Sequence, residues 1–294
     1  MSAILQVTNL FKHYDSFTLD HVSLSVEGGC ITGFIGSNGA GKTTTIKAIL
    51  GLIRADGGSI SLFGETITGH EITRSVKERL GVVFDTCPFP NASNINDIAH
   101  LGQTTYHSWN KALFNNLLER FQLKDHKQPI KDLSRGMGMK LQLAFALAHQ
   151  PNLLILDEAT AGLDPLARDE ALILLREFIS DEEHGILMSS HITSDLEKIA
   201  DHIVCIDHGK ICFTEERDVI CDFAGIAHCR SDQVPLIIES KLFPSGTVRI
   251  LRSTYHTDIL VPDRLLLQEH LPTIPIDRAS LEDYMRFMLK GEMQ

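Results

Sequence analysis

One short segment has the composition of a phosphate-binding loop. It reads GSNGAGKTT from residue 36 to residue 44 and matches the spacing GxxxxGK[ST]. Glycines let backbone N–H groups approach phosphate oxygens, and the start of the next helix adds the positive end of a dipole. Lys42 offers a cation, and the Thr43 hydroxyl can ligate Mg²⁺. The segment therefore predicts a nucleotide triphosphate site whose contacts are Gly36, Ser37, Asn38, Gly39, Ala40, Gly41, Lys42, Thr43 and Thr44.

The flanks of this loop fit the same interpretation. The strand-like stretch CITGF precedes it, and TTIKAILGLI follows it. In the second stretch Ile46, Ile49, Leu50 and Ile53 share one face of a predicted helix. A strand, a glycine-rich loop and a helix in this order are the context that phosphate binding needs.

An acidic pair ends a second apolar stretch, LLILDEAT at residues 153–160. Asp157 would emerge at the carboxyl end of a buried strand, where open α/β sheets bind ligands. Such a pair can also simply begin a loop. Together with a phosphate loop, Asp157 is a candidate Mg²⁺ contact through water, and Glu158 is a candidate base that polarises the attacking water.

A third segment, DLSRGMGMKLQLAFALAHQ, has the signature of a helix capped by Ser134. The apolar face of this helix would run through Leu141, Ala144, Phe145 and Ala148. An ordinary capped helix explains the serine. It leaves Gly136 and Gly138 unexplained, since glycine is unfavourable in a first turn; a close approach by phosphate would account for Gly136.

Composition narrows the class of protein. The chain carries 38 acidic and 27 basic residues and no long basic run, which argues against a nucleic-acid groove. Its six cysteines contain no CxxC pair, so thiols in a reducing compartment are expected. The N-terminus has no signal-peptide pattern, and no stretch approaches the roughly 18 apolar residues that cross a bilayer.

The organisation of the chain suggests several parts. Alternating short strands in residues 1–35 and again at GGSISLFGETI predict an antiparallel sheet. Residues from about 88 to 150 predict an inserted helical subdomain containing WNKALFNNLLERFQL. Apolar strands alternating with helices at NLLILDEA, HGILMSSH and HIVCIDHGKI predict a buried parallel sheet. Beyond residue 216 the sequence pattern changes to short strand-like stretches separated by prolines. This change predicts a separate small domain over 217–294.

The motifs GSNGAGKTT, LSRGM, LLILDEA, AGLDP and MSSH, in this order, resemble the ATP-binding subunit of ABC transporters over residues 1 to about 216. YHSWNKALFNNLLERFQL, GLDPLARDEALILLREFI and SLEDYMRFMLKGE further resemble bacterial type-two ABC exporters of the small-subunit group regulated by GntR-type repressors. The resemblance implies an α/β fold: a P-loop NTPase core of ABC type, a flanking antiparallel β subdomain, the inserted helical subdomain and a small C-terminal α+β domain. It also implies ATP and Mg²⁺ as cofactors.

The resemblance assigns further residues. Tyr14 takes the place of the aromatic residue that stacks on adenine, with core packing as the competing interpretation. His191 would be the switch histidine at the γ-phosphate. Asp164, before Pro165, has the makings of a helix N-cap and would also help to join two subunits. The segment that would contact ATP held by the other subunit consists of Ser134, Arg135, Gly136 and Met137.

Two places depart from the common family pattern. Asp85 stands where the family usually has a glutamine that touches Mg²⁺; a carboxylate can still meet this cation, or it can be a solvated loop acid. In LSRGM, Arg135 replaces a glycine and Met137 replaces a glutamine. Arg135 could place a planar cation near phosphate or point into solvent.

The sequence thus predicts an ATPase subunit, most simply of an exporter, in which two such chains, identical or related, close around ATP. Integral membrane subunits would be its partners, with the region 88–125 as the docking surface, and it would lie in the cytoplasm on the inner face of the membrane. A soluble ABC ATPase with an assembly or regulatory role is the alternative. A small-molecule kinase would leave LSRGM and His191 without a role.

Overall fold

The computed structural model describes residues 3–67, 71–253 and 256–293. An antiparallel sheet at the N-terminal end has the strand order β2-β1-β4-β5. Apolar residues alternate along its strands, as in the buried Leu5 and Val7 of β1, which confirms the predicted sheet. Its strands are β1 (Ala3–Tyr14), β2 (Phe17–Glu27), β4 (Gly57–Leu62) and β5 (Glu65–Ile67).

A second sheet forms the centre of the molecule, in the order β10-β9-β3-β8-β7-β6. Neighbouring strands from β9 to β6 run parallel, and β10 is antiparallel at one edge. Both β7 and β8 are buried along their whole length, as expected for a parallel sheet covered on both faces. The strands are β3 (Ile31–Ile35), β6 (Leu80–Val83), β7 (Leu153–Asp157), β8 (Gly185–Ser190), β9 (His202–Asp207) and β10 (Lys210–Glu216).

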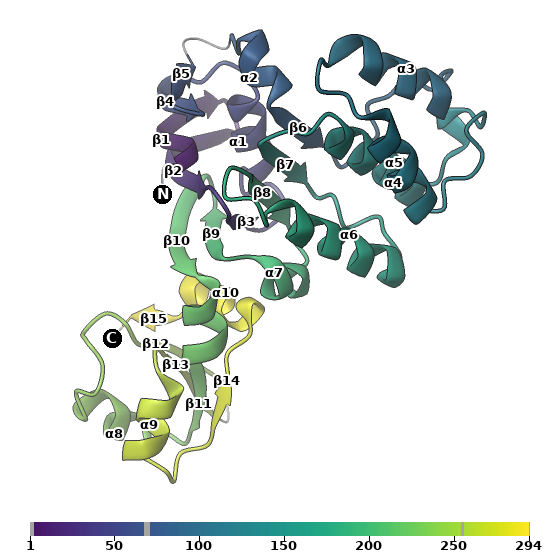
Figure 1. The fold of residues 1–294 in the computed structure, drawn as a ribbon. Helices are drawn as coiled ribbons and strands as arrows, with labels where there is room; N and C mark the ends of the chain where they lie inside the picture. The colour runs from purple at the N-terminus through teal and green to yellow at the C-terminus, as the bar shows by residue number, and fades with distance from the viewer. Residues whose placement is uncertain (1–2, 68–70, 254–255, 294) are drawn as a thin grey trace.

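Helices accompany this sheet, and Figure 1 shows α3, α4 and α5 grouped beside it. This group occupies most of the region 88–150 in which the sequence predicts helices. The helices before β10 are α1 (Lys42–Ile49), α2 (Arg74–Glu78), α3 (Ile95–Thr105), α4 (Lys111–Arg120), η1 (Ile130–Asp132), α5 (Arg135–Ala148), α6 (Pro165–Phe178) and α7 (Thr193–Ile199).

The helix after the phosphate loop is shorter than its apolar pattern suggests. Ile46 and Ile49 are buried, but α1 ends at Ile49 and Ile53 lies outside it. Gly51 has a left-handed backbone with φ 64°, the conformation that commonly ends helices. The prediction that Ile53 belongs to the helical face is therefore wrong.

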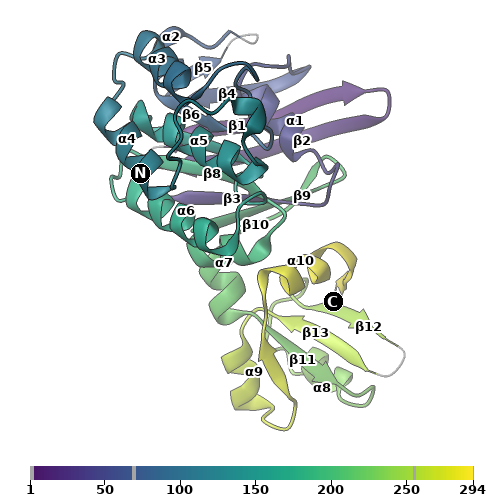
Figure 2. The ribbon, with the colours of Figure 1, turned by 90° about the vertical axis from the view of Figure 1, so that its right-hand side faces the viewer.

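The residues after β10 build a third sheet, in the antiparallel order β14-β11-β13-β12-β15 (Figures 1 and 2). Figure 2 shows this sheet below the rest of the molecule, with α10 on the side of the sheet that faces the central part. The elements are η2 (Val219–Phe223), β11 (Gly225–Cys229), α8 (Val234–Glu239), β12 (Arg249–Arg252), β13 (Thr257–Val261), α9 (Arg264–His270), β14 (Ile276–Arg278), α10 (Leu281–Lys290) and β15 (Glu292–Met293).

The C-terminal part shares an apolar core with the central part. Phe287 of α10 is fully buried in the same cluster as Leu196 of α7. The rings of Phe213 in β10 and Tyr284 in α10 meet edge to face at 5.2 Å between centroids. This shared core ties the two parts together, and a domain boundary at residue 216 stays a proposal.

Replacing Phe287 by Ala is expected to lower the free energy of unfolding by about 3–5 kcal/mol, because it removes a buried ring and leaves a cavity. Urea denaturation measures this change. Phe223→Ala is the matched control, since that ring is 50% exposed and its loss should cost much less. Equal effects of the two changes would contradict a core shared through α10.

Candidate nucleotide-binding site

The phosphate loop joins β3 to α1 at the carboxyl edge of the central sheet. A side chain at position 36 would collide with the carbonyl oxygen of Ile206 in the neighbouring strand, so only glycine fits there. Gly41 has φ 120°, which L side chains rarely adopt, and it stands at the N-cap of α1. These two glycines bring the backbone close to β9 and direct the N-terminus of α1 at the loop.

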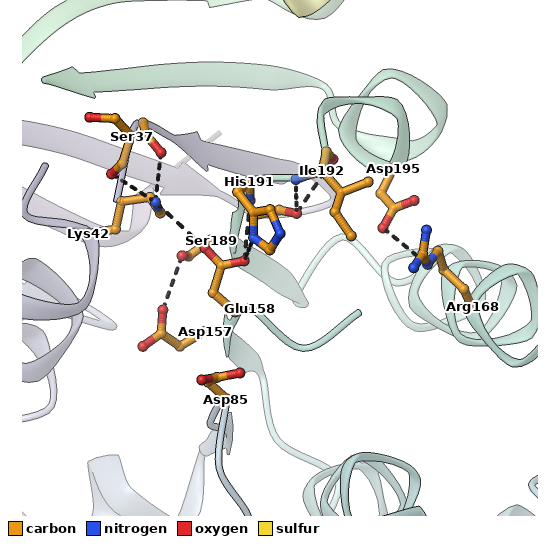
Figure 3. Close-up of polar contacts among 12 residues, drawn as sticks. Ser37, Lys42, Asp85, Asp157, Glu158, Arg168, Ser189, His191, Ile192 and Asp195 are labelled. Atoms are coloured by element: carbon orange, nitrogen blue, oxygen red, sulfur yellow. Dashed lines mark hydrogen bonds and ion pairs between the residues drawn. The ribbon is translucent and has the colours of Figure 1, made fainter. Parts of the chain in front are cut away.

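Lys42 is 6% exposed and turns back over its own loop. Its Nζ donates to the carbonyl oxygen of Gly36 at 2.7 Å and lies 3.6 Å from Oε1 of Glu158 (Figure 3). A buried ammonium group needs such partners, because desolvation penalises an unpaired charge. The lysine cation and the acidic pair therefore belong to one site.

Asp157 ends β7 and is 5% exposed. Burial raises the pKa of its carboxyl group, while hydrogen bonds from Thr43 and Ser189 act in the opposite direction. The Ser189 hydroxyl donates to Oδ1 at 3.1 Å. A desolvated carboxylate next to the Thr43 hydroxyl is a suitable pair of oxygen groups for Mg²⁺, which uses few protein ligands together with phosphates.

Glu158 follows Asp157 with a left-handed backbone, φ 56°, a conformation that costs about 1–3 kcal/mol in a residue other than glycine. Its backbone N–H donates to the carbonyl oxygen of Ser189 at 3.0 Å. His191 holds Oε2 of Glu158 twice, with Nδ1 at 2.5 Å and its backbone N–H at 3.2 Å. The turn thus aims the carboxylate into the site, and His191 fixes its direction.

Several of the remaining predicted residues stand at the starts of α5 and α6. The Ser134 hydroxyl accepts from the N–H of Met137 at 3.2 Å, and Oδ1 of Asp164 accepts from the N–H of Ala167 at 3.1 Å. Both predicted N-caps are confirmed. Arg135 forms an ion pair with Asp85.

A pocket of about 620 Å³ collects most of the predicted groups. The predicted residues that are not among its lining residues are Tyr14, Gly36, Ala40, Ser134, Gly136, Met137, Asp157 and Asp164. Tyr14 is 39% exposed at the end of β1, and Lys12 places its Nζ 5.3 Å from the ring centroid. Lining residues outside the phosphate loop are Ser16, Phe17, Asp85, Arg135, Glu158 and His191.

The sequence interpretation missed several residues of this site. Phe17 lines the pocket directly across the hairpin from Tyr14, its partner in the β1–β2 register. Ser37 donates to Oδ1 of Asp207 at 3.1 Å, which ties the loop to the end of β9. The sequence could have indicated Phe17, because it is a second aromatic residue three positions after Tyr14. Among the described residues, no group of three or more His, Cys, Asp or Glu side chains could hold a metal ion by itself.

Residues 19–161 match the family described as ABC transporter. The chain is 36% identical over 213 residues to the bacitracin transport ATP-binding protein BcrA of Bacillus licheniformis, covering 72% of this chain and 69% of the relative. It is also 36% identical over 218 residues to the Nod factor export ATP-binding protein I of Cupriavidus metallidurans, covering 71% and 70%.

The chain belongs to the ABC transporter family. A solved ATP-binding subunit of an ABC transporter superposes with a TM-score of 0.67 at 28% identity, over 74% of this chain and 91% of that chain. The ABC-type fold expected from the sequence is thereby confirmed. The chain is an ATP-binding subunit with ATPase activity, and the resemblance to the GntR-regulated group stays a prediction. No helix in the described ranges is long and apolar enough to cross a membrane.

Proposed function

We propose that this ABC ATPase powers an exporter, and that two copies, or one copy and a related chain, close around ATP. The single observation that carries the proposal is the joining of Lys42, Glu158 and His191 in the pocket formed by the phosphate loop. The relatives named for bacitracin transport and Nod factor export support the transport role. Integral membrane subunits would convert closing and opening into solute movement, with this chain on the inner face of the membrane.

The loop Gly36–Thr44 would hold the phosphates with its N–H groups, and Lys42 would exchange its carbonyl partners for phosphate oxygens. Thr43 and Asp157 would hold Mg²⁺; Asp85, the further candidate from the family pattern, is paired with Arg135. When bound, this ion would neutralise phosphate charge. Glu158 would take the proton of the attacking water on its carboxylate, while His191 keeps that group aimed.

The second half of the site would come from the partner. Ser134 and Arg135 are exposed at the start of α5, where free N–H groups can receive the phosphate of the opposite chain. Asp164 caps α6 in the loop that packs under this start. Closure would therefore depend on nucleotide, since phosphate fills the space between the two protein surfaces.

Tyr14→Ala is expected to weaken ATP binding about fivefold, because ring stacking on adenine is worth about 1 kcal/mol. Calorimetric titration with ATP measures this change, and Tyr14→Phe is the control that keeps the aromatic face. Phe17→Ala belongs in the same series, since Phe17 lines the pocket. A loss of affinity in Phe17→Ala alone would move the stacking role from Tyr14 to Phe17.

The test of the proposed function as a whole is purification from membranes. The full chain should co-purify with a multi-span membrane protein and hydrolyse ATP in that complex. Recovery of the full chain from cells without any membrane partner would favour the assembly or regulatory role instead.

A further inference from the structure

The segment that follows β6, residues 84–87, lies along one face of α5. Gln142, which is 2% exposed, binds the backbone of Phe84 twice. Its Oε1 accepts from the N–H of Phe84 at 3.0 Å, and its Nε2 donates to the carbonyl oxygen at 3.2 Å. A buried amide that satisfies both backbone groups of one residue fixes this segment against the helix.

Two further contacts continue along the same helix face toward its N-terminus. A Cβ at Gly138 would lie 3.3 Å from Cβ of Cys87, so backbone and side chain touch there. Arg135 then pairs with Asp85 at the first turn. Positions 135, 138 and 142 are spaced by three and four residues, which places them on one side of an α-helix.

The start of α5 also packs against the loop that precedes α6. A Cβ at Gly162 would lie 3.0 Å from Cγ of Arg135, and a Cβ at Gly136 would lie 2.8 Å from the carbonyl oxygen of Gly162. The Arg135 side chain thus contacts the loop at Gly162 and pairs with the carboxylate of Asp85 in the segment after β6. Both Asp85 and Arg135 line the nucleotide pocket (Asp85 is drawn below Asp157 in Figure 3).

We infer that Asp85 and Arg135 act as one positioning unit within the chain: the carboxylate holds the guanidinium group and thereby sets the place of Ser134 at the start of α5. Asp85 serves as the partner of Arg135 and not as a metal ligand. The pairing also neutralises a carboxylate that would otherwise repel the phosphates of ATP. The inference rests on the proposed function, in that Ser134 must meet the nucleotide of a second chain.

The alternatives make different demands on these side chains. A metal-binding Asp85 would act independently of Arg135. An Arg135 that binds phosphate of the opposite chain would act independently of Asp85. Only a unit of the two predicts that removing either partner has the same effect as removing both.

The test is a double-mutant cycle on ATP turnover with Asp85→Gln, Arg135→Gly and the double variant, each in the full chain. We expect each single change to lower turnover about tenfold through misplacement of the α5 start. The double variant should also fall about tenfold. If turnover of the double variant fell about a hundredfold, the product of the two single effects, the two residues would act independently and the inference would be overturned.

Further readouts separate positioning from other roles. The Mg²⁺ concentration for half-maximal turnover should stay the same in all variants; a several-fold rise in Asp85→Gln alone would identify a metal ligand and overturn the inference. Melting temperatures should stay within about 2 °C, because the pair is 59% and 46% exposed. A larger fall would indicate a merely structural role and also overturn it.

Two control variants complete the design. Arg135→Lys keeps the charge and should retain at least about a third of turnover; turnover as low as in Arg135→Gly would count against the ion pair. Lys198→Gln breaks a pair with Asp169 of similar exposure, 57% and 59%, away from the pocket and should leave turnover within about twofold. Failure of the unchanged protein to bind ATP would refute the proposed function itself, independently of the cycle.

Discussion

Glu158→Gln is expected to bind ATP with nearly unchanged affinity and to hydrolyse it at least about a hundredfold more slowly. The amide keeps the size of the carboxylate but cannot accept a proton from water, and general-base contributions are typically of this size. Phosphate release under saturating ATP measures turnover, and calorimetric titration measures affinity.

The structure suggests why this side chain is suited to the role. The left-handed backbone of Glu158 and the two contacts from His191 aim its carboxylate at the phosphate loop. Glu239→Gln in α8 is the matched control, since that residue is exposed and distant in the fold. Turnover of the Glu158→Gln protein at the rate of the unchanged protein would remove Glu158 from its assigned role.

Ser134→Arg should abolish ATP-dependent dimerisation while a single chain still binds nucleotide. A bulky cation at this exposed position would fill the space that the phosphate of the opposite chain must enter. Light scattering after size-exclusion chromatography, in the Glu158→Gln background with saturating ATP, measures the mass of the particle.

Two controls separate steric blocking from the loss of the helix cap. Ser134→Ala removes only the hydroxyl that accepts from Met137, at a cost of about 1 kcal/mol, and should retain some dimer. Ser75→Arg introduces the same side chain at an exposed position of α2 and should dimerise normally. Unchanged dimerisation of Ser134→Arg would refute a site shared between two chains.

The site was largely predictable wherever function depends on local chain geometry. The phosphate loop, Asp157 and Glu158 follow directly from buried strands, because the carboxyl ends of parallel strands meet at one edge. The caps at Ser134 and Asp164 follow from residue type alone, since short polar side chains satisfy the N–H groups of a first turn.

Contacts between distant segments were not predictable in the same way. Asp85 and Arg135 are 50 positions apart. Their pairing depends on Gln142, which holds Phe84, the neighbour of Asp85, against α5. The pattern of residue types along the chain carries no information about which residues of the two segments face each other. The packing of α10 was equally unpredictable. The sequence pattern places this helix in a separate small domain, but its Phe287 packs into the apolar core of the central part.

The embedding of α10 beside α7 has a mechanical consequence. Apolar packing joins the two helices, and so does a hydrogen bond of 2.7 Å from the N–H of Leu281 to Glu197, so the C-terminal part is anchored to the central part at this contact. Helices α8 and α9 lie at the opposite end of the C-terminal part, farthest from the central sheet in Figure 2. Any rotation of the central part that is passed on through this contact would therefore displace α8 and α9 farther than the residues beside α7.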